Sequence, residues 1–249
     1  MMEPRGNPGK SQNNQTKSPT LGHSTLPFVF ALDQKWSDAQ IWVERLGKEI
    51  WGFKVGSILF TEEGPAAIRY LKSKGQRVFL DLKFHDIPNT VSGAVKVAFD
   101  VGVDWLTVHA AGGQKMLEAI APLQNSSQKI LAITVLTSLE ESDTKALGWN
   151  RPISEQVKSM ADLAMQVGIA GLVSSPHEVE FLRTRYENAL LITPGVRFSQ
   201  EHQDQKRTAA AKKALDDGSS CVVLGRALSE SKNWESTWQE IKSSLDAKS

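Results

Sequence analysis

The sequence predicts an α/β protein built as a single (β/α)8 barrel, the TIM-barrel architecture, after a disordered N-terminal tail. Three observations support this prediction. Eight short apolar segments recur along the chain, longer stretches with helical spacing separate them, and polar side chains stand where most of the apolar segments end. Eight consecutive strand–helix units are the number that closes a parallel barrel.

Residues 1–25 differ in composition from the rest of the chain. Asn, Gln, Ser, Thr, Pro and Gly dominate there, and apolar residues are almost absent. Such a segment cannot bury enough apolar surface to offset the entropy lost on ordering. We therefore predict a disordered tail over 1–25 and one barrel domain over 26–249.

The predicted strands are short runs rich in β-branched and aromatic residues. Because the strands of a parallel barrel are buried on both faces, these runs should be almost continuously apolar, as FVFAL, ILAIT and CVVLG are. The predicted ranges are 27–33, 52–56, 77–84, 104–110, 129–137, 171–175, 189–195 and 220–225.

The segments between the predicted strands carry apolar residues at three- and four-residue spacings, the pattern of amphipathic helices. The clearest are Ser37–Ile50, Thr90–Val101 and Ile153–Val167. We expect Ser37 to cap the first of these helices, since serine is a favoured N-cap residue. Asp33 then remains available to bind a hydroxyl group.

A doubly wound open sheet uses the same strand–helix units, so periodicity alone leaves it as an alternative. An open sheet gathers its functional residues at one crevice, whereas the strands of a barrel all end at one mouth. Candidate residues here lie near or just after the end of every predicted strand except the sixth, which favours the barrel. They are Asp33, Lys54, Asp81, Lys83, His109, Thr137, Ser138, Arg197, Gly225 and Arg226.

Composition excludes several functional classes. The 249 residues carry 29 basic and 28 acidic side chains, a net charge of +1, which does not suggest a nucleic-acid polymer or an anionic membrane as partner. No apolar run approaches the roughly 18 residues of a membrane-spanning helix, and no signal peptide is apparent. The only cysteine, Cys221, cannot form an intrachain disulfide. We expect a cytoplasmic protein.

The segment DLKFHDIPNT, residues 81–90, is the strongest candidate for chemistry. Asp81 and Lys83 should share a strand face, and Asp86 should lie in the loop before a helix that begins near Pro88. Lys54 on the neighbouring strand would complete an alternating network that keeps its lysines protonated. The alternative is that Asp81 and Lys83 form only a salt bridge that closes a barrel layer. Such a salt bridge would not explain the additional charges of Lys54 and Asp86 or the presence of a phosphate site elsewhere.

The segments TPGVR (193–197) and VVLGRAL (222–228) suggest a phosphate site. The loops after strands seven and eight commonly bind phosphate in this barrel. Gly225 permits close backbone approach, and Arg226 can supply a bidentate charge. Surface arginines that cap helices are the alternative. His85 and His109 lack the spacing of metal ligands with one another, and no Cys/His cluster exists, so we predict no metal.

From Pro27 to about Ala227 the chain resembles the orotidine 5′-phosphate decarboxylases of the bacterial type. The matching pieces are ALD (31–33), FKVG (53–56), DLKFHDIPNT (81–90), VHAAGG (108–113), TVLTS (134–138), TPGVR (193–197), DQKR (204–207) and VLGR (223–226). The resemblance implies cofactor-free decarboxylation of orotidine 5′-phosphate to UMP in de novo pyrimidine biosynthesis.

The same resemblance implies roles for individual residues. Lys83 would donate the proton within a network of Lys54, Asp81, Lys83 and Asp86. The chain would form a homodimer in which Asp86 and Thr90 reach the partner's site. The implied substrate-binding residues are Asp33, Lys54 and Thr90 for the ribose, Thr137 and Ser138 for the pyrimidine, Gln205, Gly225 and Arg226 for the phosphate with Arg197 nearby, and also Ile87 and Pro194.

Two rival functions remain open. A sugar-phosphate decarboxylase or aldolase, such as a 3-keto-gulonate 6-phosphate decarboxylase, shares the D-x-K-x-x-D pattern but uses Mg²⁺ and has a metal-binding acid where this chain has Lys54. A non-catalytic barrel that binds phosphorylated ligands would keep the phosphate site. The complete charged network argues against it, because burying charges is costly when they serve no reaction.

Overall fold

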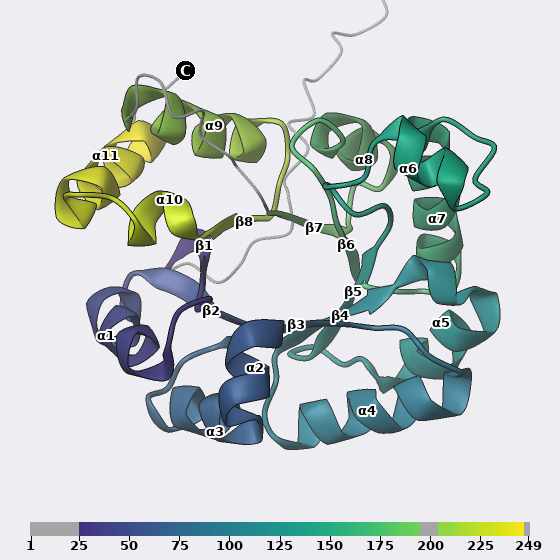
Figure 1. Cartoon of the computed structure of the whole chain (residues 1–249), viewed down its shortest axis with the longest axis horizontal. Coiled ribbons are helices and arrows are strands. Elements are labelled where there is room, and N and C mark those ends of the chain that lie inside the picture. The colour runs from purple at the N-terminus through teal and green to yellow at the C-terminus, as the bar shows by residue number, and fades with distance from the viewer. Residues whose placement is uncertain (1–24, 195–203, 247–249) are drawn as a thin grey trace, which may run out of the picture.

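The computed structural model describes residues 25–194 and 204–246, and it shows a closed barrel of eight parallel strands (Figure 1). Each strand pairs with its neighbours in sequence, and β8 (Cys221–Leu224) pairs with β1 (Leu26–Ala31) to close the ring. The predicted barrel is thereby confirmed, and the open sheet is excluded. The predicted tail lies outside the described residues except for residue 25.

All eight predicted strands are present, and most end earlier than predicted. The others are β2 (Ile50–Gly56), β3 (Val78–Phe84), β4 (Trp105–His109), β5 (Lys129–Ile133), β6 (Gly171–Val173) and β7 (Leu190–Thr193). β5 stops at Ile133 because its partner β6 offers only the three paired positions Gly171–Val173. Thr137 and Ser138 therefore lie in the loop after β5, and Asp33 lies in the loop after β1.

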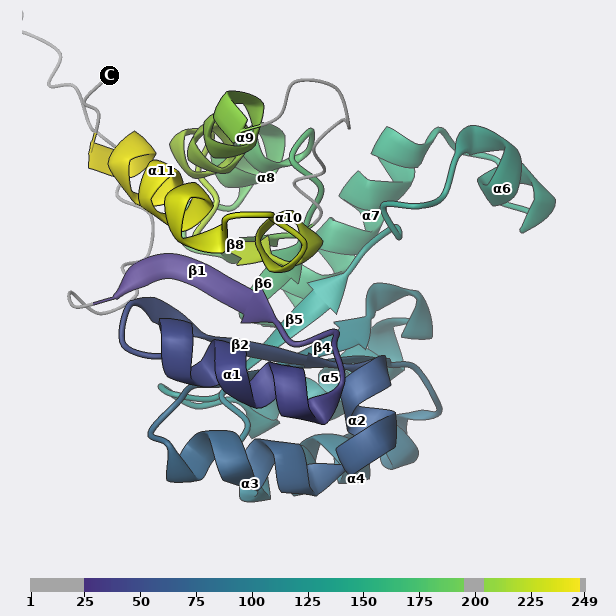
Figure 2. The ribbon, with the colours of Figure 1, turned by 60° about the vertical axis from the view of Figure 1, so that its left-hand side comes forward.

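The helices form an outer ring around the strands (Figures 1 and 2). In chain order they are α1 (Trp36–Leu46), α2 (Ser57–Glu63), α3 (Pro65–Ser73), α4 (Pro88–Asp100), the 3-10 turn η1 (Ala110–Gly112), α5 (Gln114–Ile120), the 3-10 turn η2 (Ala121–Leu123), α6 (Glu141–Ala146), α7 (Ile153–Gln166), α8 (Val179–Arg185), α9 (Asp204–Asp216), α10 (Arg226–Ser229) and α11 (Trp234–Asp246).

The helix boundaries follow local chemistry. α4 begins at Pro88, whose fixed φ and missing N–H suit the first helical position. It turns Val91, Val95 and Phe99 toward the core at four-residue intervals. The prediction that Ser37 caps the first helix is wrong. α1 begins one residue earlier, at Trp36, and the capping position is Lys35, which makes no side-chain cap hydrogen bond.

The barrel interior is filled by a small cluster of apolar side chains toward the N-terminal ends of the strands. Trp51 and Trp105 stack there with ring centroids 3.5 Å apart, so both tryptophans serve packing. Cys221 belongs to the same cluster, and burial raises the pKa of its thiol. A second, larger core lies between the strands and the helices. Because these side chains fill the barrel toward the N-terminal ends of the strands, the space for a cavity lies at the C-terminal ends.

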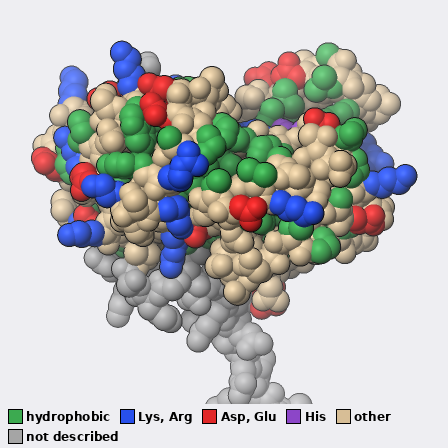
Figure 3. All heavy atoms as spheres, turned by 90° about the horizontal axis from the view of Figure 1, so that it is seen from below, with side chains coloured by type: hydrophobic (Ala, Val, Ile, Leu, Met, Phe, Trp, Pro, Cys, Tyr) green, Lys and Arg blue, Asp and Glu red, His purple; other side chains and the backbone are tan. Residues whose placement is uncertain are grey.

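None of the helices within the described ranges is long and apolar enough to cross a bilayer. On the face shown in Figure 3, basic and acidic side chains are interspersed rather than gathered by sign. This distribution agrees with the near-zero net charge of the sequence.

Candidate active site

A cavity of about 1430 Å³ opens at the C-terminal ends of the strands. It is lined by residues from strands, loops and helices that are far apart in sequence, as expected for the mouth of a parallel barrel. Eight of the residues predicted from the sequence line it: Asp33, Lys54, Asp81, Lys83, Thr137, Pro194, Gly225 and Arg226.

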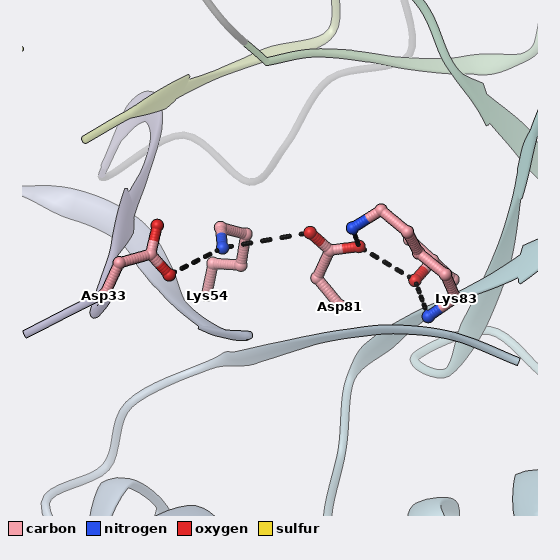
Figure 4. A network of polar contacts seen from close by, with 5 residues as sticks. Asp33, Lys54, Asp81 and Lys83 are labelled. Carbon is pink, nitrogen blue, oxygen red and sulfur yellow. Dashed lines mark hydrogen bonds and ion pairs between the residues drawn. The ribbon is translucent and has the colours of Figure 1, made fainter. Parts of the chain in front are cut away.

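Four of these side chains form a continuous array of alternating charge (Figure 4). Lys54 Nζ lies 3.0 Å from Asp33 Oδ1 and 3.8 Å from Asp81 Oδ2. Lys83 Nζ lies 3.0 Å from Asp81 Oδ1. The Lys54 and Asp81 side chains are only 12% and 16% exposed, so each charge depends on its neighbours for stabilisation. The array holds two ammonium groups at fixed positions beside the cavity.

The local structure of β3 differs from the simple alternation that the sequence suggested for Asp81 and Lys83. Lys83 has φ of 55°, in the left-handed region, and it is the only non-glycine residue with positive φ in the described ranges. The pairing of β3 with β4 also shifts register between Leu80 and Phe84. Lys83 therefore reaches Asp81 through an irregular strand and not through a regular two-residue repeat.

Thr107 on β4 is a site residue that the sequence analysis missed. Its hydroxyl donates to Asp81 Oδ1 at 2.9 Å and accepts from the Lys83 amide at 2.9 Å, while its side chain is fully buried. The available signal was a hydroxyl residue inside the apolar run WLTVH, two residues before His109. The loop after β6 was also missed, and it brings Ser175 and His177 to the cavity.

His109, the last residue of β4, stands beside this array. The pKa of His109 is lowered, chiefly because the ring is buried and further because His85 and Lys83 lie near it. The rings of His85 and His109 have centroids 5.4 Å apart. His109 is therefore neutral near pH 7 and adds no third positive charge next to Lys83.

The opposite side of the cavity is formed by the end of β8 and the start of α10. Gly225 immediately precedes α10, and a Cβ built on it would meet only the Ala31 Cβ, at 3.8 Å. Arg226 is exposed and lines the cavity. The glycine leaves open space there, and the adjacent guanidinium supplies positive charge, so this side suits an anionic group.

Four other predicted residues with described side chains, namely Asp86, Ile87, Thr90 and Ser138, are not among those that line this cavity. Asp86, Ile87 and Thr90 are exposed at the end of β3 and the start of α4, and Asp86 Oδ1 accepts a hydrogen bond from the Ile87 amide. Ser138 is exposed in the loop after β5. Arg197 lies outside the described residues. Gln205 lies in α9, but its side chain is outside the described part of the structure.

A parallel barrel whose strands converge on a linked set of aspartates and lysines defines the chain as a TIM-barrel enzyme. The model of the orotidine 5′-phosphate decarboxylase / HUMPS family matches residues 27–241. The chain belongs to this family.

Individual relatives agree with the family match. The chain is 42% identical over 224 residues to the orotidine 5′-phosphate decarboxylase of Psychromonas ingrahamii, covering 87% of this chain and 96% of the relative. It is 38% identical over 243 residues to that of Pectobacterium carotovorum, covering 95% and 97%. The crystal structure of the Lactobacillus acidophilus orotidine 5′-phosphate decarboxylase superposes with a TM-score of 0.74 at 33% identity, covering 89% of this chain and 99% of that one.

Proposed function

We propose that Lys83 supplies the proton when this chain, a carboxy-lyase of pyrimidine biosynthesis, converts orotidine 5′-phosphate to UMP and CO₂. The observation that supports this role is the array of Asp33, Lys54, Asp81 and Lys83 along the cavity. Lys83 is the last of these four residues in the array. Within the array, its ammonium pairs only with Asp81.

The chemistry of the reaction requires such a group. Loss of CO₂ from C6 of the pyrimidine leaves an electron pair in a ring σ orbital, which the π system cannot delocalise. Stabilisation must then come from fixed charge near C6, and an ammonium held in a partly buried site supplies it with little reorganisation. The same ammonium then donates a proton to C6, and the product is UMP. This scheme requires no cofactor.

The substrate is proposed to lie across the cavity between the charged array and the β8 end. Asp33 and Lys54 would bind the ribose hydroxyls, and Thr137 and Ser138, with Ile87 and Pro194, would lie near the pyrimidine. Arg226 and Gly225 would bind the phosphate, together with Arg197 and Gln205. The support is that Asp33 and Lys54, proposed for the ribose, and Gly225 and Arg226, proposed for the phosphate, line one continuous cavity.

We further propose that two copies of the chain form a dimer in which Asp86 and Thr90 of each copy complete the other's site. Both residues are exposed and stand apart from the cavity of their own chain. Ile87, between them, is 66% exposed, and Val97 on α4 is 61% exposed. Exposed large apolar side chains are typical of a surface that is covered by a partner.

A cytoplasmic location is also proposed. Substrate and product are both nucleotides, whose charged phosphate keeps them within the compartment where they are made. The chain's single cysteine, which is buried, suits a reducing environment.

The function is tested by following the loss of ultraviolet absorbance as orotidine 5′-phosphate becomes UMP, with and without EDTA. We expect equal rates in both conditions. The Mg²⁺-dependent rival needs an acidic metal ligand where this chain has Lys54, and Lys54 Nζ already occupies the position between two carboxylates. A rate that falls with EDTA and recovers with Mg²⁺ would favour the sugar-phosphate enzymes, and binding of UMP without any turnover would favour a non-catalytic barrel.

Arg226→Ala is expected to raise KM for orotidine 5′-phosphate about 10- to 100-fold, because hydrogen bonds to a charged group contribute about 1.5–3 kcal/mol. Steady-state kinetics provide the measurement. Arg151→Ala is the matched control, since Arg151 is an exposed arginine that bonds Ser159 away from the cavity. An unchanged KM in Arg226→Ala would remove Arg226 from the phosphate site.

A further inference from the structure

Thr107 on β4 contacts the charged array, and its hydroxyl links two of the array's residues. The Lys83 amide donates to Thr107 Oγ1, and the hydroxyl proton is donated to Asp81 Oδ1, each at 2.9 Å. The directions are fixed, because the amide can only donate and an ionised carboxylate can only accept. We propose that Thr107 is a positioning residue that sets where the Lys83 ammonium stands in the cavity. This inference rests on the proposed role of Lys83 as proton donor.

The first part of this role concerns the backbone of Lys83. β3 and β4 pair at Phe79↔Trp105 and Leu80↔Leu106, then resume only at Phe84↔Val108. Three residues of β3 therefore stand opposite the single residue Thr107. Lys83 takes up the irregularity with its positive φ, a conformation that side chains other than glycine rarely adopt. The Thr107 hydroxyl accepts a hydrogen bond from the Lys83 amide at a position where β3 and β4 are not paired. This hydrogen bond stabilises the positive-φ conformation of Lys83.

The second part concerns the Asp81 carboxylate. Oδ1 accepts from both Thr107 and Lys83 Nζ, while Oδ2 faces Lys54 Nζ at 3.8 Å. With the Thr107 bond in place, the carboxylate plane is fixed, and each oxygen serves one lysine. Without that bond the carboxylate can rotate about its side-chain torsion, and the Lys83 ammonium loses its fixed anchor.

Thr107 itself does not reach the substrate. Its side chain is fully buried, and it is absent from the residues that line the cavity. A change at Thr107 should therefore act on the chemical step through Lys83 and leave nucleotide binding nearly intact. Fixed placement of a charged group matters for catalysis because small displacements weaken its interaction with the developing charge.

The test uses Thr107→Val, which keeps the shape of threonine and removes the hydroxyl. We expect kcat for orotidine 5′-phosphate to fall about 10- to 100-fold, the loss that corresponds to a hydrogen bond with a charged group, while KM and the affinity for UMP change less than about threefold. Thr107→Ser retains the hydroxyl and should keep kcat within about threefold of the unmodified chain.

Thr134→Val is the matched control. Thr134 is buried just after β5, and its hydroxyl has no hydrogen-bond partner among the described residues, so the same substitution removes no bond there. Kinetics of the unmodified chain should be retained. Equal losses of kcat in Thr134→Val and Thr107→Val, or a normal kcat in Thr107→Val, would overturn the proposal.

A folding failure of Thr107→Val does not end the test, because Thr107→Cys keeps a side chain of similar size with a weaker donor. Its kcat should lie between those of the serine variant and the Lys83→Ala variant, with unchanged UMP affinity, and a kcat equal to that of the unmodified chain counts against the proposal. The proposed function fails separately: if Lys83→Ala keeps full activity, Lys83 is not the proton donor. If Lys83→Ala is inactive and Thr107→Val is fully active, only the role of Thr107 is wrong.

Discussion

Lys83→Ala is expected to lower kcat for orotidine 5′-phosphate decarboxylation at least about 10⁴-fold, because in the proposed mechanism this one group both stabilises the carbanion and protonates it. The ammonium of Lys83 is held 3.0 Å from Asp81 at the end of the charged array, and a water molecule that entered the space left by the lysine would not be held with the same orientation. Single-turnover measurement of UMP formation checks this expectation, since it reports the chemical step directly.

Binding separates loss of chemistry from loss of structure in this experiment. Lys83→Ala should still bind UMP in calorimetry, because phosphate binding is assigned to the β8 side of the cavity. Lys74→Ala is a matched control, since Lys74 forms an exposed ion pair with Glu44 outside the cavity and should leave kcat unchanged. Near-normal turnover in Lys83→Ala would exclude Lys83 as the proton donor.

The barrel and most of the cavity could be predicted from the sequence for a simple physical reason. Parallel strands that are buried on both faces are continuous apolar runs, and a polar residue at the end of such a run has only the barrel mouth to occupy. Asp33, Lys54 and Asp81 follow this rule, and all three line the cavity. Gly225 and Arg226 follow it as well.

The irregular pairing around Lys83 could not be predicted in the same way. The two-residue alternation of strands places Asp81 and Lys83 on one face, but the structure joins them through a register shift and a positive φ. Register depends on the facing strand, which is distant in sequence, so a local pattern does not contain it. Thr107 was missed for the same reason, since its importance depends on which atoms of β3 lie opposite it.

The roles proposed for Asp86 and Thr90 require a second copy of the chain, which a single chain cannot display. Each is exposed here, and neither lines the cavity of its own chain. In a two-fold dimer, each site would take Lys83 from one copy and Asp86 from the other. The two copies can then be inactivated separately and recombined.

Mixing Lys83→Ala chains with Asp86→Ala chains is expected to restore about a quarter of the unmodified activity, because half of randomly paired dimers are mixed and each mixed dimer has one intact site. Each variant alone should be nearly inactive, so the recovery is large. The measurement is the absorbance assay after co-expression with two affinity tags, which confirm that mixed dimers form. Lys83→Ala mixed with Asp81→Asn is the control. Lys83 and Asp81 of each site come from the same chain, so a mixed dimer of these two variants has no intact site. If mixed dimers form without recovery in the first pair, Asp86 acts within its own chain and the shared site is wrong.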